Sequence, residues 1–317
     1  MQKLNLLYFL ILFFLVNTHQ SKAQSLRSLI LYSDAIVVAQ ESKTIEQNKF
    51  LSDYYESKKQ QTNISIAEWL KTPLTKNLLK NIIVKDSTVV DFIIRRPEPV
   101  ESIEPHREYY NLYFLKKTGK IYQTLYSKQY QSADYDLLKK AIPRLLSIKK
   151  IKDTKQKFSA TVDWILENSK TDSYYRILPI YDLDTTSVFM RFYKQKSVID
   201  TNNILAPLQR KKLKEIIFSD TTGYQLAIRT ELVHLFYKDF AKETDAFLIK
   251  FIEEQISDLR GNEWKIKSAL ETLYANNKSY NTMADLIDNY NWYSNSDNGE
   301  ELRKKLNNFL TEAKADK

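Results

Sequence analysis

The sequence predicts an α+β protein of two domains, in which a small antiparallel β-barrel precedes an all-α domain arranged as a helical array or bundle. Three observations carry this prediction. Residues 109–126 alternate in the manner of a β-hairpin about Gly119. Beyond Leu137 the apolar residues recur with the period of an α-helix. The charge also divides, since residues 24–150 carry a net charge of +7 and residues 151–317 carry no net charge.

The hairpin is the most readable element of the chain. Two aromatic-rich runs flank the Lys-Lys-Thr-Gly-Lys turn of residues 116–120, and Gly119 is the residue that can adopt a positive φ there without a Cβ clash. Large side chains occupy both faces of the first run. We therefore expect a strand that is covered on both sides, as in a small closed barrel.

Four further segments ahead of the hairpin have the composition of short strands. They are Ser33–Ala39, Asn63–Lys71, Asn81–Val84 and Val89–Ile94. The proline-rich segment 95–106 cannot be a central strand, so we interpret it as an exposed loop. His106 lies there among several carboxylates, and we interpret this cluster as a solvated acidic loop and not as a metal site.

The segments SDAIVVA (33–39), EWLK (68–71) and YYNLYFLKKTGKIY (109–122) together resemble the small β-barrel domain of uncharacterised secreted bacterial proteins. That domain is similar in architecture to the OB-like barrel of tissue inhibitors of metalloproteinases and of netrin modules. The resemblance implies an OB-like barrel over residues 24–150. The inhibitors act through an N-terminal Cys and a disulfide framework, and this chain contains no Cys, so their mechanism is not expected here.

The N-terminus has the three-part pattern of a secretory signal peptide. Lys3 is followed by an apolar run from Leu4 to Val16, a polar stretch, and small residues at Ser21 and Ala23. The run is too short to span a bilayer, so we expect residues 1–23 to be removed and the protein to be periplasmic or secreted, with no stable membrane span in the mature chain.

Residues 151–317 are predicted to be all-helical. One apolar template, i, i+4, i+7, i+8, begins at Ile228, at Ile266 and at Leu302, with offsets of 38 and 36 residues. Such a period indicates a helix-pair array of the HEAT or armadillo kind, and an ordinary helical bundle is the alternative. Pro207 is expected in the first turn of a helix, and a basic connector, 149–157, is expected to join the two domains.

No catalytic constellation is visible in the sequence. The four glycines form no phosphate-binding loop and no nucleophile elbow, and His234 has no second His one turn away. Four carboxylate pairs are neighbours in sequence only, namely Asp182 and Asp184, Glu253 and Glu254, Asp285 and Asp288, and Glu300 and Glu301. We therefore expect no enzyme, no cofactor and no metal.

Three functions remain open at this level. The favoured one is an exported, non-catalytic binding protein with an unidentified protein partner. The second is binding of an acidic polymer, an anionic polysaccharide or a nucleic acid, by a basic groove with aromatic stacking. The third is a hydrolase that uses an unrecognised carboxylate pair. The candidate binding surface consists of Lys71, Lys76, Tyr113, Lys116, Lys117, Lys120 and Tyr122.

Overall fold

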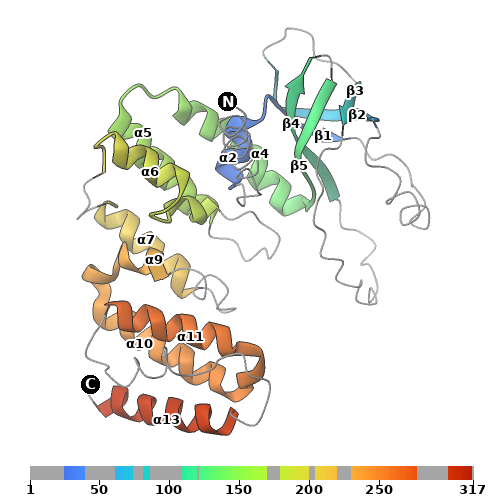
Figure 1. Ribbon diagram of the computed structural model, residues 1–317. Helices are drawn as coiled ribbons and strands as arrows, with labels where there is room; N and C mark the ends of the chain where they lie inside the picture. Colours follow the sequence, from blue (N-terminus) through green and yellow to red (C-terminus); the bar gives the residue numbers. More distant parts are fainter. Residues whose placement is uncertain are drawn as a thin grey trace, which may run out of the picture. The chain divides into compact units, whose positions relative to one another are not determined.

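The computed structural model describes residues 25–39, 61–73, 81–85, 109–119, 121–169, 179–199, 204–219, 230–276 and 299–315. The predicted signal peptide, the predicted strand at 89–94 and the loop around His106 lie outside these residues. The described residues group into two compact units, with unit 1 ending at Lys150 and unit 2 beginning at Ile151 (Figure 1). Strands occur in unit 1 and helices in both units, so the predicted α+β class is confirmed.

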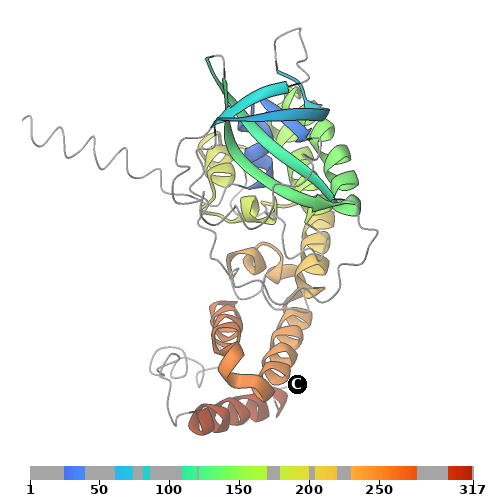
Figure 2. The same ribbon diagram turned by 90° about the vertical axis from the view of Figure 1, so that its right-hand side faces the viewer.

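Unit 1 combines five described strands with two helices. Its elements are α2 (Leu26–Tyr32), β1 (Ala35–Ala39), β2 (Gln61–Lys71), β3 (Asn81–Lys85), β4 (Tyr109–Thr118), β5 (Ile121–Gln131) and α4 (Ser132–Lys149). Hydrogen bonds join the strands in the order β1-β2-β3-β5-β4, and β4 pairs again with β1. Figure 2 shows β4 and β5 as long, curved ribbons.

One strand pairing differs from the antiparallel sheet that the sequence predicts. β3 and β5 run parallel and share two residue pairs, Val84 with Tyr122 and Lys85 with Gln123, whereas the other four pairings are antiparallel. The reason is arithmetic, because strand direction cannot alternate all the way round a ring of five. One pairing must therefore be parallel. Here it is the pairing of β3 with β5, which is the shortest of the described pairings.

The β4–β5 hairpin confirms the prediction for this stretch, with a tighter turn than expected. Thr118 pairs with Ile121, so only two residues connect the strands. Gly119 has a φ of +65°, which matches the positive φ required at the first central position of a two-residue hairpin loop.

Both faces of the central strands are buried, as the sequence predicts. One face forms a cluster of Ala35, Val37, Leu115 and Tyr122, against which four partly buried residues pack: Ala39, Ile66, Trp69 and Tyr113. On the other face Ile36 pairs with Phe114 and Val38 with Leu112, and all four are buried. Helices α2 and α4 both contact β4.

Helix α4 is longer than the helix predicted from Leu137 onward, because it begins at Ser132, directly after β5. It is fastened to the strands by polar and aromatic contacts. The Tyr135 hydroxyl donates a hydrogen bond to Glu68, the Tyr135 ring stacks on Tyr110 at 4.1 Å between centroids, and Lys139 Nζ lies 2.8 Å from Glu68 Oε1. The hydrogen bond from Lys139, followed by that from Tyr135, holds the pKa of Glu68 below its ordinary value.

Unit 2 is helical throughout its described part. Its elements are α5 (Thr154–Asn168), η1 (Pro179–Leu183), α6 (Val188–Gln195), α7 (Pro207–Phe218), α9 (Thr230–His234), α10 (Tyr237–Gln255), η2 (Ile256–Asp258), α11 (Leu259–Asn276) and α13 (Gly299–Ala315). Helices α10 and α11 run side by side, and α13 contacts both. Since α5 begins at Thr154, the predicted basic connector at 149–157 is helical except for 150–153.

The apolar templates predicted for unit 2 are confirmed in two helices. Ile266, Leu270 and Leu273 are buried in α11, and the stripe in α13 is buried at Leu302, Leu306, Phe309 and Leu310. The first template fails as one helix, because α9 ends at His234, ahead of two members, Leu235 and Phe236. Pro207 is the first residue of α7, as predicted. None of the described helices is long and apolar enough to cross a membrane.

Candidate functional site

The structure separates the seven residues of the candidate binding surface. Lys76 and Lys120 lie outside the described residues. Tyr122 is 6% exposed in the core between the strands, and Tyr113 packs against that core. These two rings are therefore part of the packing and do not form a stacking platform on the surface. Lys71, Lys116 and Lys117 remain as lysines at the ends of β2 and β4.

Lys71 has a structural partner, which is the C-terminus of α2. Its ammonium donates hydrogen bonds to three backbone carbonyls, those of Ile30 at 2.8 Å, Leu31 at 3.4 Å and Ser33. The last carbonyls of a helix have no partner within the helix, and a cation satisfies both their hydrogen bonding and the helix dipole. Burial, followed by the nearby charge of Lys149, lowers the pKa of Lys71.

Asp34 organises the two lysines of β4. Its Oδ1 lies 3.1 Å from Lys116 Nζ, and its Oδ2 accepts a 2.9 Å hydrogen bond from the backbone N–H of Lys117. Burial pushes the pKa of Asp34 upward, but the hydrogen bonds from Lys117 and Lys116 outweigh it, so the pKa lies below its ordinary value. Lys116 also donates to the Tyr32 carbonyl at 3.3 Å.

These contacts define a basic region of unit 1 that we call the lysine end: Tyr32, Lys71, Lys116, Lys117 and Lys149. The Tyr32 side chain is 65% exposed, the highest exposure among the large hydrophobic residues that the structure describes. Lys116, Lys117 and Lys149 are also exposed. The charges of Lys71 and Lys116 act on the Asp34 carboxylate, and the charge of Lys149 acts on Lys71. With four lysines to one carboxylate, the lysine end retains an excess of positive charge.

The side chain and backbone of Lys117 have different roles. The backbone N–H anchors the end of β4 to Asp34, whereas the side chain is exposed. A substitution at this position therefore removes a cation from the lysine end without removing the hydrogen bond to Asp34. Lys71 and Lys116, by contrast, also hold α2 in place through their ammonium groups.

Sequence reasoning missed Tyr32, Asp34 and Lys149 as members of this region. Tyr32 ends a seven-residue helix whose only sequence signal is its N-cap, Ser25, which accepts a 3.2 Å hydrogen bond from the Ser28 N–H. Asp34 was predicted only as part of a strand, although a carboxylate ahead of a buried run can receive hydrogen bonds from a neighbouring strand. Lys149 was assigned to the connector.

The carboxylate pairs do not form a catalytic pair in the described residues. Asp184 Oδ1 accepts hydrogen bonds from the Thr186 N–H and hydroxyl, both at 2.7 Å. Glu253 pairs with Lys314 at 2.6 Å and Glu254 with Lys250 at 3.6 Å. Glu300 and Glu301 lie in the first turn of α13, and Asp285 and Asp288 lie outside the described residues.

Metal ligands do not gather in the described part of the chain either, since no three His, Cys, Asp or Glu residues there are placed to hold an ion together. His234 ends the short helix α9, and His106 lies outside the described residues.

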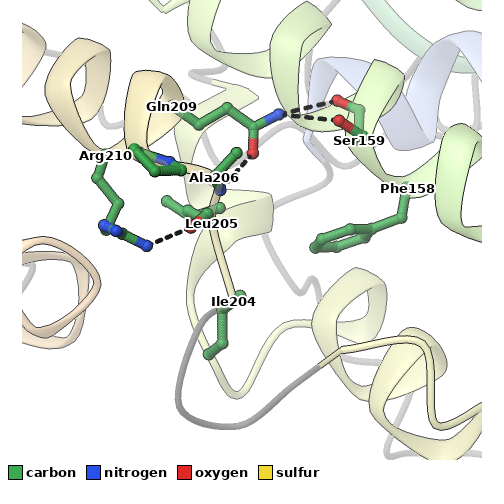
Figure 3. A pocket seen from close by; sticks show the side chains of 8 residues that line it. Phe158, Ser159, Ile204, Leu205, Ala206, Gln209 and Arg210 are labelled. Atoms are coloured by element: carbon green, nitrogen blue, oxygen red, sulfur yellow. Dashed lines mark hydrogen bonds between the residues drawn. The ribbon is translucent and has the colours of Figure 1, made fainter.

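A hollow of about 360 Å³ lies between α5 and the start of α7 (Figure 3). Its polar side chains are already engaged. Gln209 Oε1 accepts the Ala206 N–H at 3.0 Å, and Gln209 Nε2 donates to the Ser159 carbonyl at 3.2 Å and the Ser159 hydroxyl at 3.3 Å. Arg210 donates to the Leu205 carbonyl at 2.6 Å and to Asp239 at 2.7 Å. We interpret this hollow as a packing feature that fastens α7 to α5.

The fold and this region define a class, an α+β protein whose described strand unit has a basic end. Comparison of the chain with models of known families, with curated proteins and with solved structures finds no match.

Proposed function

We propose that this protein is an exported, non-catalytic binding protein whose lysine end binds an acidic partner. The observation that carries the proposal is the tip of the β4–β5 hairpin, where the exposed Lys117 side chain lies on a backbone fixed by Asp34. Lysines on a fixed backbone attract anions without the loss of backbone freedom that a mobile loop would incur. The exposed ring of Tyr32 adds an apolar face beside the cations.

The arrangement of the strands supports an OB-like type for this barrel. OB-like barrels have five strands in a partly open Greek-key arrangement and bind oligonucleotides and oligosaccharides with one strand face and neighbouring loops, including the loop between strands four and five. Here five described strands pair in the order β1-β2-β3-β5-β4, and two lysines of the proposed site, Lys116 and Lys117, lie at the end of β4, next to its connection to β5.

Export decides which acidic partners the proposal includes. The signal-peptide pattern of residues 1–23 predicts a mature chain that begins at Gln24, outside the cytoplasm. Nucleic acid is then a less suitable partner than an anionic polysaccharide or the acidic surface of a protein. Because Tyr113 and Tyr122 are packed in the barrel, base stacking on the predicted aromatic residues does not support a nucleic-acid partner either.

Binding to dextran sulfate, with uncharged dextran as the matched polymer, tests this proposal. The full chain should bind dextran sulfate and not dextran, and Lys117→Gln should weaken binding severalfold. Lys155→Gln, which removes an exposed lysine of α5 in unit 2, is the control and should bind as the wild type does. Equal losses in the two variants, or equal binding of the two polymers, would contradict a site at the lysine end.

A parallel measurement with polyglutamate distinguishes the two acidic partners. If carboxylates on a polypeptide are the natural ligand, polyglutamate should bind at least as tightly as dextran sulfate at equal charge concentration, and Lys117→Gln should weaken it. A polysaccharide partner is supported if dextran sulfate binds more tightly than polyglutamate.

A further inference from the structure

Helix α6 of unit 2 has an apolar pair on its outer side. Val188 and Phe192 are 56% and 49% exposed, and a spacing of four residues places them on one face of the helix. The opposite face is buried. Phe189 and Tyr193 stack and tilt against Phe158 of α5 at centroid distances of 5.6 and 5.0 Å, so the orientation of α6 in unit 2 is fixed by its aromatic side.

Exposed cations lie beside this pair. Arg191 and Lys194 are exposed residues of α6, and Lys196 follows its last residue. With a 100° turn per residue, Arg191 lies next to Val188 on the outer face, and Lys194 lies between Arg191 and the buried side. The helix sequence VFMRFYKQ contains no carboxylate. The nearest acidic residue before it, Asp184, accepts two hydrogen bonds from Thr186.

We infer that the outer face of α6 binds an anionic lipid surface, with Val188 and Phe192 entering the interface and Arg191, Lys194 and Lys196 contacting lipid phosphates. A membrane interface satisfies both kinds of side chain at once, since apolar groups enter the acyl boundary and cations stay at the level of the headgroups. A polyanion in water would neutralise the cations but leave the Phe192 ring in contact with solvent.

A protein partner is the alternative occupant, and the shape of the surface argues against it. Recognition of a peptide helix uses a hydrophobic groove that receives its apolar anchors. Here the apolar side chains project from one short helix. The hollow at Gln209 includes no residue of α6, and neither does a second hollow, which is lined by Glu253, Ile256 and Lys314. A projecting surface suits insertion into a lipid layer.

The test must report on α6 itself, because the N-terminal apolar run and the lysine end could also bring the chain to a vesicle. The chain contains no Cys, so Gln195→Cys gives a single labelling position on the outer face of α6, three residues from Phe192. An environment-sensitive fluorophore there should shift its emission to the blue on vesicles of phosphatidylcholine with phosphatidylglycerol. Lys155→Cys, on an exposed position of α5, is the labelled control.

Two pairs of substitutions in the Gln195→Cys chain sharpen the test. Each cation near an anionic surface contributes about fivefold to binding, so Arg191→Gln with Lys194→Gln should raise the lipid concentration at half-shift by about 25-fold. Val188→Ser with Phe192→Ser should abolish most of the shift. Circular dichroism would verify that both variants keep the helical content of the wild type.

Three outcomes would overturn the inference. The first is an unchanged emission at position 195 on vesicles that the chain demonstrably binds. The second is an equal shift on vesicles of phosphatidylcholine alone, which would show that the cations do not contribute. The third is a shift with an acidic amphipathic peptide and none with either vesicle, which would assign the surface to a protein partner.

Discussion

Replacement of Lys71 by Met distinguishes a structural lysine from a ligand-binding one. The substitution keeps much of the aliphatic stem and removes the ammonium that serves the carbonyls of Ile30, Leu31 and Ser33. Ile30 and Ser33 are almost fully buried, so water cannot readily replace the lost donor. An unsatisfied buried acceptor costs about 1–3 kcal/mol, and relief of the desolvation of Lys71 offsets part of this cost.

We therefore expect Lys71→Met to lower the free energy of unfolding of unit 1 by about 2 kcal/mol. For a unit of this size the change corresponds to a fall of roughly 4–8 °C in the unfolding temperature. Urea unfolding followed by circular dichroism would measure the first quantity and a thermal scan the second. Lys71→Arg, which keeps a cation, should lose less.

The reasoning about Lys71 would be refuted by a specific pattern. If Lys71→Met unfolds within about 0.5 kcal/mol of the wild type, as a surface substitution does, while dextran sulfate binding falls tenfold, Lys71 is a ligand-binding residue and does not cap α2.

Three further perturbations follow from the geometry. The pKa values of Asp34 and Glu68 are lowered in the folded protein. Their stabilisation of the fold is therefore present above the ordinary carboxyl pKa and is lost as the pH falls through the lowered pKa values. Urea titrations should show Asp34→Asn and Glu68→Gln less stable than the wild type at pH 7 and nearly equal to it at pH 2. Gly119→Ala should lower the free energy of unfolding by about 1–2 kcal/mol, because a residue with a Cβ is disfavoured at a φ of +65°. No atom lies within 4 Å of the added Cβ, so the backbone conformation alone causes this loss. An unchanged unfolding midpoint would argue against that turn. Phe309→Ala should destabilise unit 2 by about 3–5 kcal/mol, whereas a loss under 1 kcal/mol would show that α13 packs loosely.

Local patterns in the sequence predicted much of the fold. The alternation of residues 109–126 predicted the hairpin, and Gly119 has the positive φ that its position in the turn demanded. Pro207 begins a helix, where its missing N–H is no disadvantage. The apolar stripes of α11 and α13 are buried as their period required. Each of these features depends on residues that are neighbours along the chain.

The candidate site was predicted less well because its geometry depends on distant contacts. Lys71 binds carbonyls about forty residues earlier in the chain, which no local pattern reveals. An irregularity between Phe114 and Leu115 of β4 shifts the register of its pairing with β5. As a result, Leu115 pairs with Thr124 and Lys117 with Tyr122. A shift of one residue exchanges the faces of a strand, so alternation along the chain could not show that Tyr122 shares a face with Leu115 in the core.

The dependence of dextran sulfate binding on salt tests the central claim most directly. If the lysine end binds the polymer by displacing its counterions, the logarithm of the binding constant should fall linearly with the logarithm of the salt concentration. Lys117→Gln should make that slope shallower by about one, as expected for a lost phosphate-type contact, while Lys155→Gln should leave it unchanged. A wild-type slope near zero, or identical slopes for the wild type and Lys117→Gln, would contradict an anion-binding function for the lysine end.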